Sequence, residues 1–416
     1  SRAGQSATMG GWETDCNAGN VGAIMGVVVG LEGIDERWRV QMNDLLVAAS
    51  LIGQRNLTDI PACADLFTRL GGEIAGQPVG AKPRLHFDYP GSTHGAQSRA
   101  RLAEVIDLRQ KDGALSIIVR GLKKKGEATV YWRTYCRPGE LSANYYGASF
   151  SPTLYPGQQI TARLFAPAGA EGLLASLYVW DANHGRAYQA KAVLLESGQW
   201  TELKFQVPRL HNALLSEIGL TLHTVGEAWS GHLLLDDMSW AGAPSFSTDF
   251  QQERSEYGAI SQWTYLRGYW RQEADGYHGS APATGESYTG SLSWTDIQLR
   301  VGIKPLVGDH HNVNLRVQGA RRAYAVGLAS DNRLVLYKNA GAYHEVAAMP
   351  FVWQHGERHE FRITAVGNVI AVETNDGRNL QWQDDASPYL TGQVGFSVMH
   401  GSHACYTDLT VEGYAA

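Results

Sequence analysis

From residue 84 to the end of the chain, short apolar or alternating segments follow one another, separated by turn residues. Successive side chains of a β-strand point to opposite faces, so this pattern predicts strands rather than helices. Many short strands with Gly, Asn and Asp between them are typical of antiparallel β-sandwiches. This pattern covers most of the chain, and it constrains the fold more than any other feature.

The strand pattern divides into two sets at residues 242–245 (GAPS). The first set comprises residues 115–120, 129–135, 159–165, 174–180, 201–207, 218–223 and 232–238. The second set comprises residues 291–303, 313–317, 323–328, 333–337, 360–366, 369–373, 395–399 and 408–412. Turn sequences suited to hairpins lie at residues 330–333, 365–368 and 375–378. We therefore predict one sandwich over residues 84–242 and a second over residues 245–416.

Residues 1–76 have a helical pattern instead. Apolar residues at helical spacing run through residues 17–31, and the pattern continues at residues 35–38, 44–51 and 58–70, with Gly71-Gly72 as the predicted stop. Residues 77–83 are a Gly- and Pro-containing linker. Four helices are few for a core of their own. The predicted fold class is therefore an incomplete all-α segment followed by two antiparallel β-sandwich (jelly-roll) domains.

The composition of the chain excludes several classes of binding partner. The chain has 416 residues, a length that favours two or three domains. Charged residues make up 18% and the net charge is −6, so no basic surface is available for nucleic acid. The longest apolar run, residues 21–31, is too short to span a membrane. Four widely separated cysteines form no CxxC pair, which argues against a zinc site or dense disulfides and leaves the disulfide state open.

A polar loop, residues 10–17 (GGWETDCN), directly precedes the first helix. Glu13 and Asp15 are two positions apart, so both carboxylates can turn towards one point, and oxygen ligands suit Mg²⁺ or Ca²⁺. Acidic residues before a helix are also ordinary helix caps. The spacing alone leaves both interpretations open.

Residues 11–38 (GWETDCNAGNVGAIMGVVVGLEGIDERW) and 55–71 (RNLTDIPACADLFTRLG) resemble the carboxy-terminal signature of the ADP-ribosylglycohydrolase family. In that family a Gly-x-Asp-Thr-Asp-Thr/Cys loop leads into a helix of small residues. The resemblance implies an all-helical domain with a two-Mg²⁺ centre that helps to cleave the glycosidic bond at C1″ of ADP-ribose.

Carried over by position, the resemblance implies that Glu13, Asp15 and Cys16 are Mg²⁺ ligands. Glu13 is one methylene longer than the usual Asp, and the Cys16 thiol suits Mg²⁺ poorly. The family's other ligands come from a Thr-Asp-Asp segment, which does not precede this loop. We expect half of a binuclear site here, with a missing amino-terminal part or a second chain completing the domain. Alone, this chain is expected to be inactive, and its catalytic residues stay unknown.

Residues 84–242 resemble the galactose-binding-type jelly roll of carbohydrate-binding modules, on residues 198–208 (GQWTELKFQVP) and 233–240 (LLLDDMSW). In many such modules a structural Ca²⁺ lies between the last strand and the first, which implicates Asp237 and Asp88. The alternative is an ordinary pair of surface aspartates.

Residues 245–416 resemble the concanavalin-like or laminin-G-like sandwich, including the domain of 3-keto-disaccharide hydrolase relatives, on residues 357–363, 367–377 and 389–396. The candidate sugar-stacking residues of the two sandwiches are Trp132, Tyr145, Trp180, Trp263 and Trp270. For each of them a core position is the favoured interpretation, because large aromatic residues dominate cores. His310, His311, His400 and His403 are predicted to be loop histidines without a metal, since no carboxylate or Cys accompanies them at helical spacing.

Two functions follow from these features. The first is the carboxy-terminal portion of an ADP-ribosylglycohydrolase-type hydrolase, whose Mg²⁺ assists water attack at an anomeric carbon, with glycan-binding sandwiches. The second is a non-catalytic carbohydrate-binding protein with a degenerate helical segment. A third reading makes the sandwiches spacers or subunit interfaces. The expected partner is a glycan or an ADP-ribosylated substrate, and glycan-binding domains favour a secreted or periplasmic location.

Overall fold

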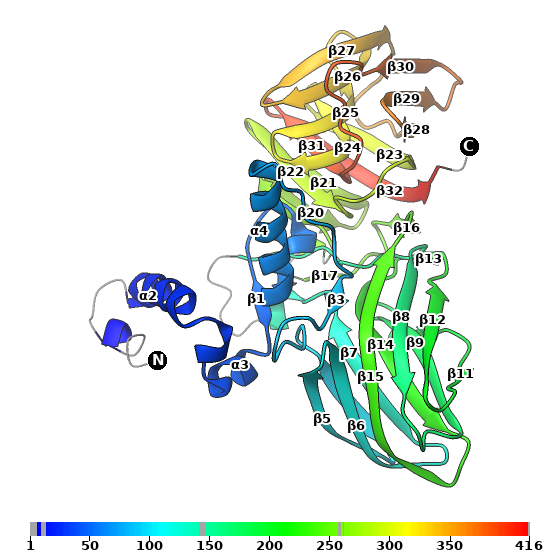
Figure 1. Cartoon of the computed structure of the whole chain (residues 1–416). Helices are drawn as coiled ribbons and strands as arrows, with labels where there is room; N and C mark the ends of the chain where they lie inside the picture. Colours follow the sequence, from blue (N-terminus) through cyan, green and yellow to red (C-terminus); the bar gives the residue numbers. More distant parts are fainter. Residues whose placement is uncertain (1–5, 10–13, 141–146, 257–258, 261, 415–416) are drawn as a thin grey trace.

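A computed structural model describes residues 6–9, 14–140, 147–256, 259–260 and 262–414. A helical segment precedes two antiparallel β-sandwiches, and this confirms the predicted fold class (Figure 1). Within the described ranges, no helix has the length and apolar character needed to cross a bilayer.

The helical segment contains a small hairpin as well as helices. Its elements are α2 (Thr14–Val29), η1 (Leu31–Gly33), α3 (Glu36–Met42), β1 (Leu45–Val47), η2 (Gly53–Arg55), β2 (Leu57–Asp59) and α4 (Ile60–Ile74). The helix predicted over residues 44–51 is therefore wrong. Asn43 and Asp44 both have positive φ (46° and 60°), which ends α3 and turns the chain into β1, which pairs antiparallel with β2.

The predicted stop at Gly71-Gly72 is also wrong, because α4 continues through both glycines to Ile74. The residue that ends the helix is Gly76, whose φ of +69° is the left-handed conformation of a helix C′ glycine. Gly72 is required for a different reason: a Cβ there would lie 2.5 Å from the carbonyl oxygen of Gln77.

The first sandwich packs two sheets face to face. Its strands are β3 (Leu85–His86), β4 (Gln97–Arg101), β5 (Glu104–Lys111), β6 (Ala114–Lys123), β7 (Glu127–Arg133), β8 (Gln159–Ala166), β9 (Leu173–Asp181), β10 (Arg186–Gln189), β11 (Val193–Leu194), β12 (Gln199–Gln206), β14 (Leu215–Thr224) and β15 (Ala228–Ala241). One sheet has the order β10-β9-β14-β7-β4, and the other has the order β12-β8-β15-β6-β5. The short β3 pairs with β15, so the first strand of the domain lies beside the last.

The second sandwich follows the same principle. Its strands are β16 (Ser245–Asp249), β17 (Ser255–Glu256), β18 (Ala259–Ile260), β19 (Thr264–Arg267), β20 (Tyr269–Glu273), β21 (Gly276–Ser280), β22 (Thr284–Thr289), β23 (Ile297–Val307), β24 (His311–Gly319), β25 (Arg322–Ala329), β26 (Arg333–Ala340), β27 (Tyr343–Pro350), β28 (His359–Val366), β29 (Val369–Thr374), β30 (Asn379–Gln383), β31 (Gln393–Met399) and β32 (His403–Gly413). One sheet has the order β19-β22-β31-β24-β25-β26-β27. The other runs β13-β16-β32-β23-β28-β29-β30, with β21 on β32 and β20 on β21. Its edge strand β13 (Leu210–His211) lies between β12 and β14 in the chain and pairs parallel with β16.

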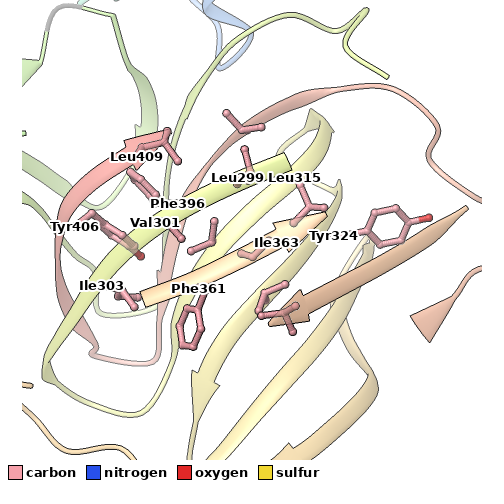
Figure 2. Packing of buried hydrophobic residues seen from close by; sticks show 14 of the residues in the cluster. Leu299, Val301, Ile303, Leu315, Tyr324, Phe361, Ile363, Phe396, Tyr406 and Leu409 are labelled. Atoms are coloured by element: carbon pink, nitrogen blue, oxygen red, sulfur yellow. The ribbon is translucent and has the colours of Figure 1, made fainter. Parts of the chain in front are cut away.

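Each sandwich has its own core between its two sheets. In the second, strands of both sheets contribute side chains such as Leu299, Val301, Ile363 and Phe396, each at most 1% exposed (Figure 2). Alternation along the strands produces this arrangement, because every second residue points inward. Burial of these apolar side chains is the main source of stability for both domains.

Hydrogen-bonded carboxylates attach the helical segment to the first sandwich. Asp44 Oδ2 accepts hydrogen bonds from Ser92 Oγ (2.9 Å) and from the backbone N–H groups of Thr93 (2.8 Å) and His94 (3.0 Å). Asp59 lies 3.0 Å from His94 Nδ1 and also caps α4 by accepting from the N–H of Ala62 at 2.8 Å. Burial is the largest single influence on His94 and disfavours its charged form, but the hydrogen bond to Asp59, the negative charges of Asp59 and Asp44 and the hydrogen bond to the His86 backbone together raise the pKa of His94.

A third carboxylate makes the same kind of attachment from α4. Asp65 accepts from Tyr89 Oη at 2.7 Å and lies 2.7 Å from His86 Nε2. Burial opposes ionisation of Asp65, yet the hydrogen bonds from Tyr89 and His86 lower its pKa. The loop of residues 86–94 is thus held by acids from three places in the helical segment.

Residues 50–57 form a wedge that contacts both sandwiches. Leu51 is buried with Tyr288, Val317 and Ala323 of the second sandwich, and its carbonyl oxygen accepts from Thr264 Oγ1 at 3.1 Å. Leu57 is buried in a separate cluster with residues of the first sandwich: Tyr135, Cys136, Ala148, Phe150 and Leu214. These contacts of the wedge hold residues 44–65 against both sandwiches.

A buried acid lies where the two sandwiches meet. Glu253 is 5% exposed and accepts hydrogen bonds from Asn183 Nδ2 of the first sandwich (2.8 Å) and from Gln262 Nε2 of the second (3.2 Å). Burial raises the pKa of Glu253 to about 7, although these hydrogen bonds and one from a backbone N–H act in the opposite direction. Its protonation state therefore changes near neutral pH.

Replacing Asp44 with Ala should weaken the attachment of residues 44–65 to the first sandwich. The substitution leaves the Ser92 hydroxyl and the N–H groups of Thr93 and His94 without their acceptor, at a cost of about 2 to 4 kcal/mol. Hydrogen exchange measured by mass spectrometry should accelerate in residues 44–65. The control is Glu104→Ala, which removes an exposed ion pair with Arg120 (3.7 Å) and should change stability by less than about 1 kcal/mol. Equal exchange rates in both variants would contradict the role given to Asp44.

Replacing Glu253 with Gln should change the pH dependence of stability. A carboxyl whose folded pKa is raised stabilises the fold fully below its unfolded pKa of about 4.5, and this contribution is lost as the pH rises through about 7. The amide does not ionise, so Glu253→Gln should be more stable than the wild type at pH 8 by about 2 kcal/mol and similar to it at pH 4. Thermal unfolding across this range measures the difference. The exposed Glu171→Gln should follow the wild-type profile at every pH, and a parallel profile for Glu253→Gln would exclude the proposed titration.

Candidate functional site

The start of α2 places two of the three metal ligands implied by the family resemblance. Asp15 and Cys16 lie in the first turn of α2, where both are exposed, and Asp15 Oδ1 accepts from the backbone N–H of Cys16 at 2.9 Å. Glu13 lies outside the described residues. An acid in the first turn also interacts favourably with the helix dipole, as the capping interpretation requires.

The donors described here do not by themselves make a Mg²⁺ site. Asp15 offers one carboxylate, and the thiol of Cys16 is a soft donor, whereas Mg²⁺ prefers several oxygen ligands in octahedral geometry. Further oxygen ligands would have to come from Glu13 and from polypeptide other than the described residues.

A large apolar groove lies against α2. Its volume is about 910 Å³, and it is lined by Thr8, Met9, Ala18, Gly22, Met25, Gly26, Val29, Gly33, Ile34, Asp35, Arg37 and Trp38. No residue of α2 is buried, and Val27 and Val28 are 88% and 70% exposed. In the described structure α2 therefore lacks the tertiary burial that normally stabilises a helix of this composition.

A second hollow lies on the outer face of the sheet β12-β8-β15. It has a volume of about 290 Å³ and is lined by Thr161, Ala162, Arg163, Trp200, Glu202 and Asp237. We call this surface the Trp200 face. Strand alternation creates it: Leu203 and Phe205 of β12 point into the core, so Trp200 and Glu202 point out.

Pairing register brings the polar members of the Trp200 face together. Glu202 of β12 lies opposite Arg163 of β8, and Arg163 lies opposite Asp237 of β15. The guanidinium of Arg163 stacks over the Trp200 ring, with Cζ 4.7 Å from the ring centroid, and donates to Asp236 at 3.0 Å. Burial, together with the nearby Asp236, raises the pKa of Asp237, and Arg163 opposes this.

Trp200 presents its ring to solvent and is held in place. It is 41% exposed, and its ring packs against Phe165 with centroids 5.2 Å apart. A half-exposed aromatic ring beside Arg, Glu and Asp combines an apolar surface with hydrogen-bonding groups, as ligand sites commonly do.

The predicted Ca²⁺ pair has the expected strand arrangement, because β3 lies beside β15 with His86 opposite Asp237. The two carboxylates have different surroundings. Asp88 is 3.1 Å from Lys82 Nζ and 3.4 Å from His86 Nδ1, whereas Asp237 lines the Trp200 face. The Ca²⁺ site stays a prediction.

The sugar-stacking residues chosen from the sequence lie mostly inside the domains. Trp132, Trp263 and Trp270 are 2%, 3% and 4% exposed, so their rings offer no open face to a sugar. Trp263 instead stacks on Phe396, with ring centroids 4.8 Å apart. Trp180 of β9 is partly exposed, and Tyr145 lies outside the described residues. Trp200, which the sequence reasoning missed, is more exposed than any of these four described tryptophans.

Of the four histidines assigned to loops, His310 and His400 lie outside the strands as predicted, and the other two do not. His311 and His403 begin β24 and β32, and His310 packs against His400 with ring centroids 4.9 Å apart. His311 is buried beside the carbonyl oxygen of Val307, 2.8 Å from its Nε2, and burial lowers the pKa of His311 to about 4. It is therefore neutral at physiological pH. His403 lies 3.0 Å from His278, on the neighbouring strand.

Residues 1–73 match the family model described as ADP-ribosylglycohydrolase, which confirms the resemblance found in this part of the sequence. No curated protein matches the chain. Among solved structures, the chain is similar to the carbohydrate-binding module CBM66 from Bacillus subtilis, with 18% identity, coverage of 36% of this chain and 95% of that chain, and a TM-score of 0.34. A Bacillus subtilis protein of unknown function with a galectin-like fold has 16% identity, coverage of 36% and 88%, and a TM-score of 0.31. The Caenorhabditis elegans galectin LEC-6 has 12% identity, coverage of 35% and 94%, and a TM-score of 0.25.

Proposed function

We propose that this chain binds glycan through the Trp200 face and carries the carboxy-terminal part of a hydrolase that cleaves a glycosidic bond. The family match over residues 1–73 supports the hydrolase, and the exposed ring of Trp200 beside Arg163, Glu202 and Asp237 is the observation that carries the glycan-binding role. Mg²⁺-assisted attack of water at an anomeric carbon belongs to this proposal only for a complete catalytic domain.

The chemistry of the Trp200 face suits a sugar. The apolar face of a pyranose ring packs on an indole, and its hydroxyl groups accept from a guanidinium or donate to carboxylates. Two of the charged groups on this face already have partners, with Arg163 next to Asp236 and Lys204 3.0 Å from Glu202. A neutral polyol needs no net charge from the protein, so it fits these paired groups better than an ionic ligand does.

The attachment of the helical segment to the first sandwich supports a function in which this segment and the Trp200 face act together. Asp65 of α4 contacts His86, and His86 lies opposite Asp237 on β15. The Trp200 face and the family-matching segment are thus connected through one strand pair and one half-buried hydrogen bond. A bound glycan would be held at a fixed position relative to α4.

Trp200→Ala should abolish most glycan binding. Loss of a central aromatic contact costs about 1 to 2 kcal/mol, which corresponds to about a 5- to 30-fold increase in the dissociation constant. The measurement is a glycan-array screen with the wild type, followed by titration of the best-binding glycan.

The matched control is Leu194→Ala, which removes an apolar residue 56% exposed on the opposite sheet of the same sandwich. It should bind like the wild type. Failure of the wild type to bind any arrayed glycan, or equal binding by Trp200→Ala, would refute the glycan-binding role.

Asp15→Asn should impair hydrolysis in a protein that has the complete ADP-ribosylglycohydrolase domain. Changes to outer-shell partners of metal ligands already cost about 10- to 100-fold, so loss of a ligand should reduce hydrolysis of an ADP-ribosyl substrate by at least about tenfold. The exposed Glu73→Gln, at the end of α4, is the control from the same segment. Wild-type rates for Asp15→Asn would exclude its role as a ligand.

The alternative is a non-catalytic glycan-binding protein. The replacement of Asp by Glu13 and the soft Cys16 donor favour it, because both weaken a Mg²⁺ site. Glycan binding through Trp200 without turnover by the complete protein would establish this alternative. Neither binding nor turnover would leave the sandwiches as spacers or interfaces.

A further inference from the structure

We propose a second, independent ligand site in the second sandwich: a Zn²⁺ site formed by Asp275, His278 and Cys405. One ligand atom from each of these side chains lies within 4.8 Å of the other two. This is the one group of three or more His, Cys, Asp or Glu side chains within metal-binding distance among the described residues. The site lies on different strands from the Trp200 face and does not depend on the glycan-binding proposal.

Sheet pairing places the three residues. His278 of β21 lies directly opposite Cys405 of β32, so their side chains share one face of the sheet. Asp275 lies in the tight turn between β20 and β21 and reaches His278, with Oδ1 2.7 Å from Nε2. Cys405 Sγ lies 3.4 Å from the backbone oxygen of Asp275.

A glycine keeps the thiol close to the turn. Gly276 has a φ of +149°, and a Cβ at this position would lie 2.7 Å from Cys405 Sγ and 2.5 Å from the backbone oxygen of Tyr406. Any other residue would therefore separate Asp275 and His278 from Cys405. The glycine accounts for the convergence of the three donors.

The fourth residue of the cluster is an outer-shell partner. His403 Nε2 lies 3.0 Å from His278 Nδ1. When His278 Nε2 binds a metal, its Nδ1–H donates to His403, which fixes the tautomer as outer-shell groups do at zinc sites. His278 is 7% exposed and Cys405 is fully buried, so both donors are already positioned by the fold.

The donor set selects the metal. Thiolate, imidazole and carboxylate together suit Zn²⁺, whereas Mg²⁺ and Ca²⁺ require oxygen donors. Around a tetrahedral Zn²⁺ with bonds of about 2.0 to 2.3 Å, ligand atoms lie about 3.3 to 3.8 Å apart. The half-exposed Asp275 side chain has the freedom to complete this approach, and the solvent on its side supplies the fourth ligand. Binding requires release of the Cys405 thiol proton.

The experiment loads the full chain with Co²⁺, which replaces Zn²⁺ and reports thiolate coordination by absorption. The wild type should bind one Co²⁺ per chain with a sulfur-to-cobalt charge-transfer band, and added Zn²⁺ should remove the band. Cys405→Ser should lose the band, and Asp275→Asn should bind Co²⁺ at least about tenfold more weakly. Cys136→Ser, which alters a buried thiol of the first sandwich, is the matched control and should keep the band.

The Asp275→Asn variant also distinguishes loss of metal binding from misfolding. This turn residue is half-exposed, so its substitution leaves the core intact. Zn²⁺ should raise the midpoint of thermal unfolding of the wild type and leave that of Asp275→Asn nearly unchanged. Absence of Co²⁺ binding by the wild type, persistence of the band in Cys405→Ser, or equal affinity in Asp275→Asn would each overturn the proposal. The cluster would then be a hydrogen-bonded tie between β21 and β32.

Discussion

The attachment of the helical segment depends on three carboxylates, the buried Asp44 and the half-buried Asp59 and Asp65. Removing a carboxylate from water is costly, so such a group is stable only where donors replace the lost solvent. All three find these donors within residues 86–94 of the first sandwich. Because this loop begins at His86, the last residue of β3, and β3 pairs with β15, the same bonds fix the part of the sheet that carries Asp237. One set of hydrogen bonds therefore relates the family-matching segment to the Trp200 face.

The same constraint divides the family-matching segment into two parts. Residues 44–65 share buried contacts with both sandwiches, whereas α2 has no buried residue and borders an open apolar groove. The part that bears Asp15 and Cys16 is thus the part least determined by the rest of the described fold. Any metal chemistry at this position depends on groups that pack against α2, and the sandwiches supply none of the groove-lining residues.

The sequence predicts what is local and misses what depends on pairing between distant residues. Alternation was sufficient to find β8, β12 and β14, and the two positive-φ residues Asp331 and Asn332 form the predicted hairpin between β25 and β26. The polar edge strands β4 and β5 have weak apolar alternation and were not predicted. The helix expected over residues 44–51 failed because the carboxylate of Asp44 is used by a loop about 50 residues away.

The two proposed sites show the same limit. Trp200 could have been found, because Leu203, Phe205 and Val207 alternate with Trp200, Glu202 and Lys204 in the sequence and assign the latter to the solvent face. Asp275, His278 and Cys405 could not, because the thiol opposite His278 lies 127 positions further along the chain and no spacing rule covers that distance. These three ligands come from a turn and two neighbouring strands, so only the pairing register of the strands brings them together. Register is specified by the buried face, here by Tyr277 opposite Tyr406, so the aromatic core of the second sandwich is what brings the three donors together.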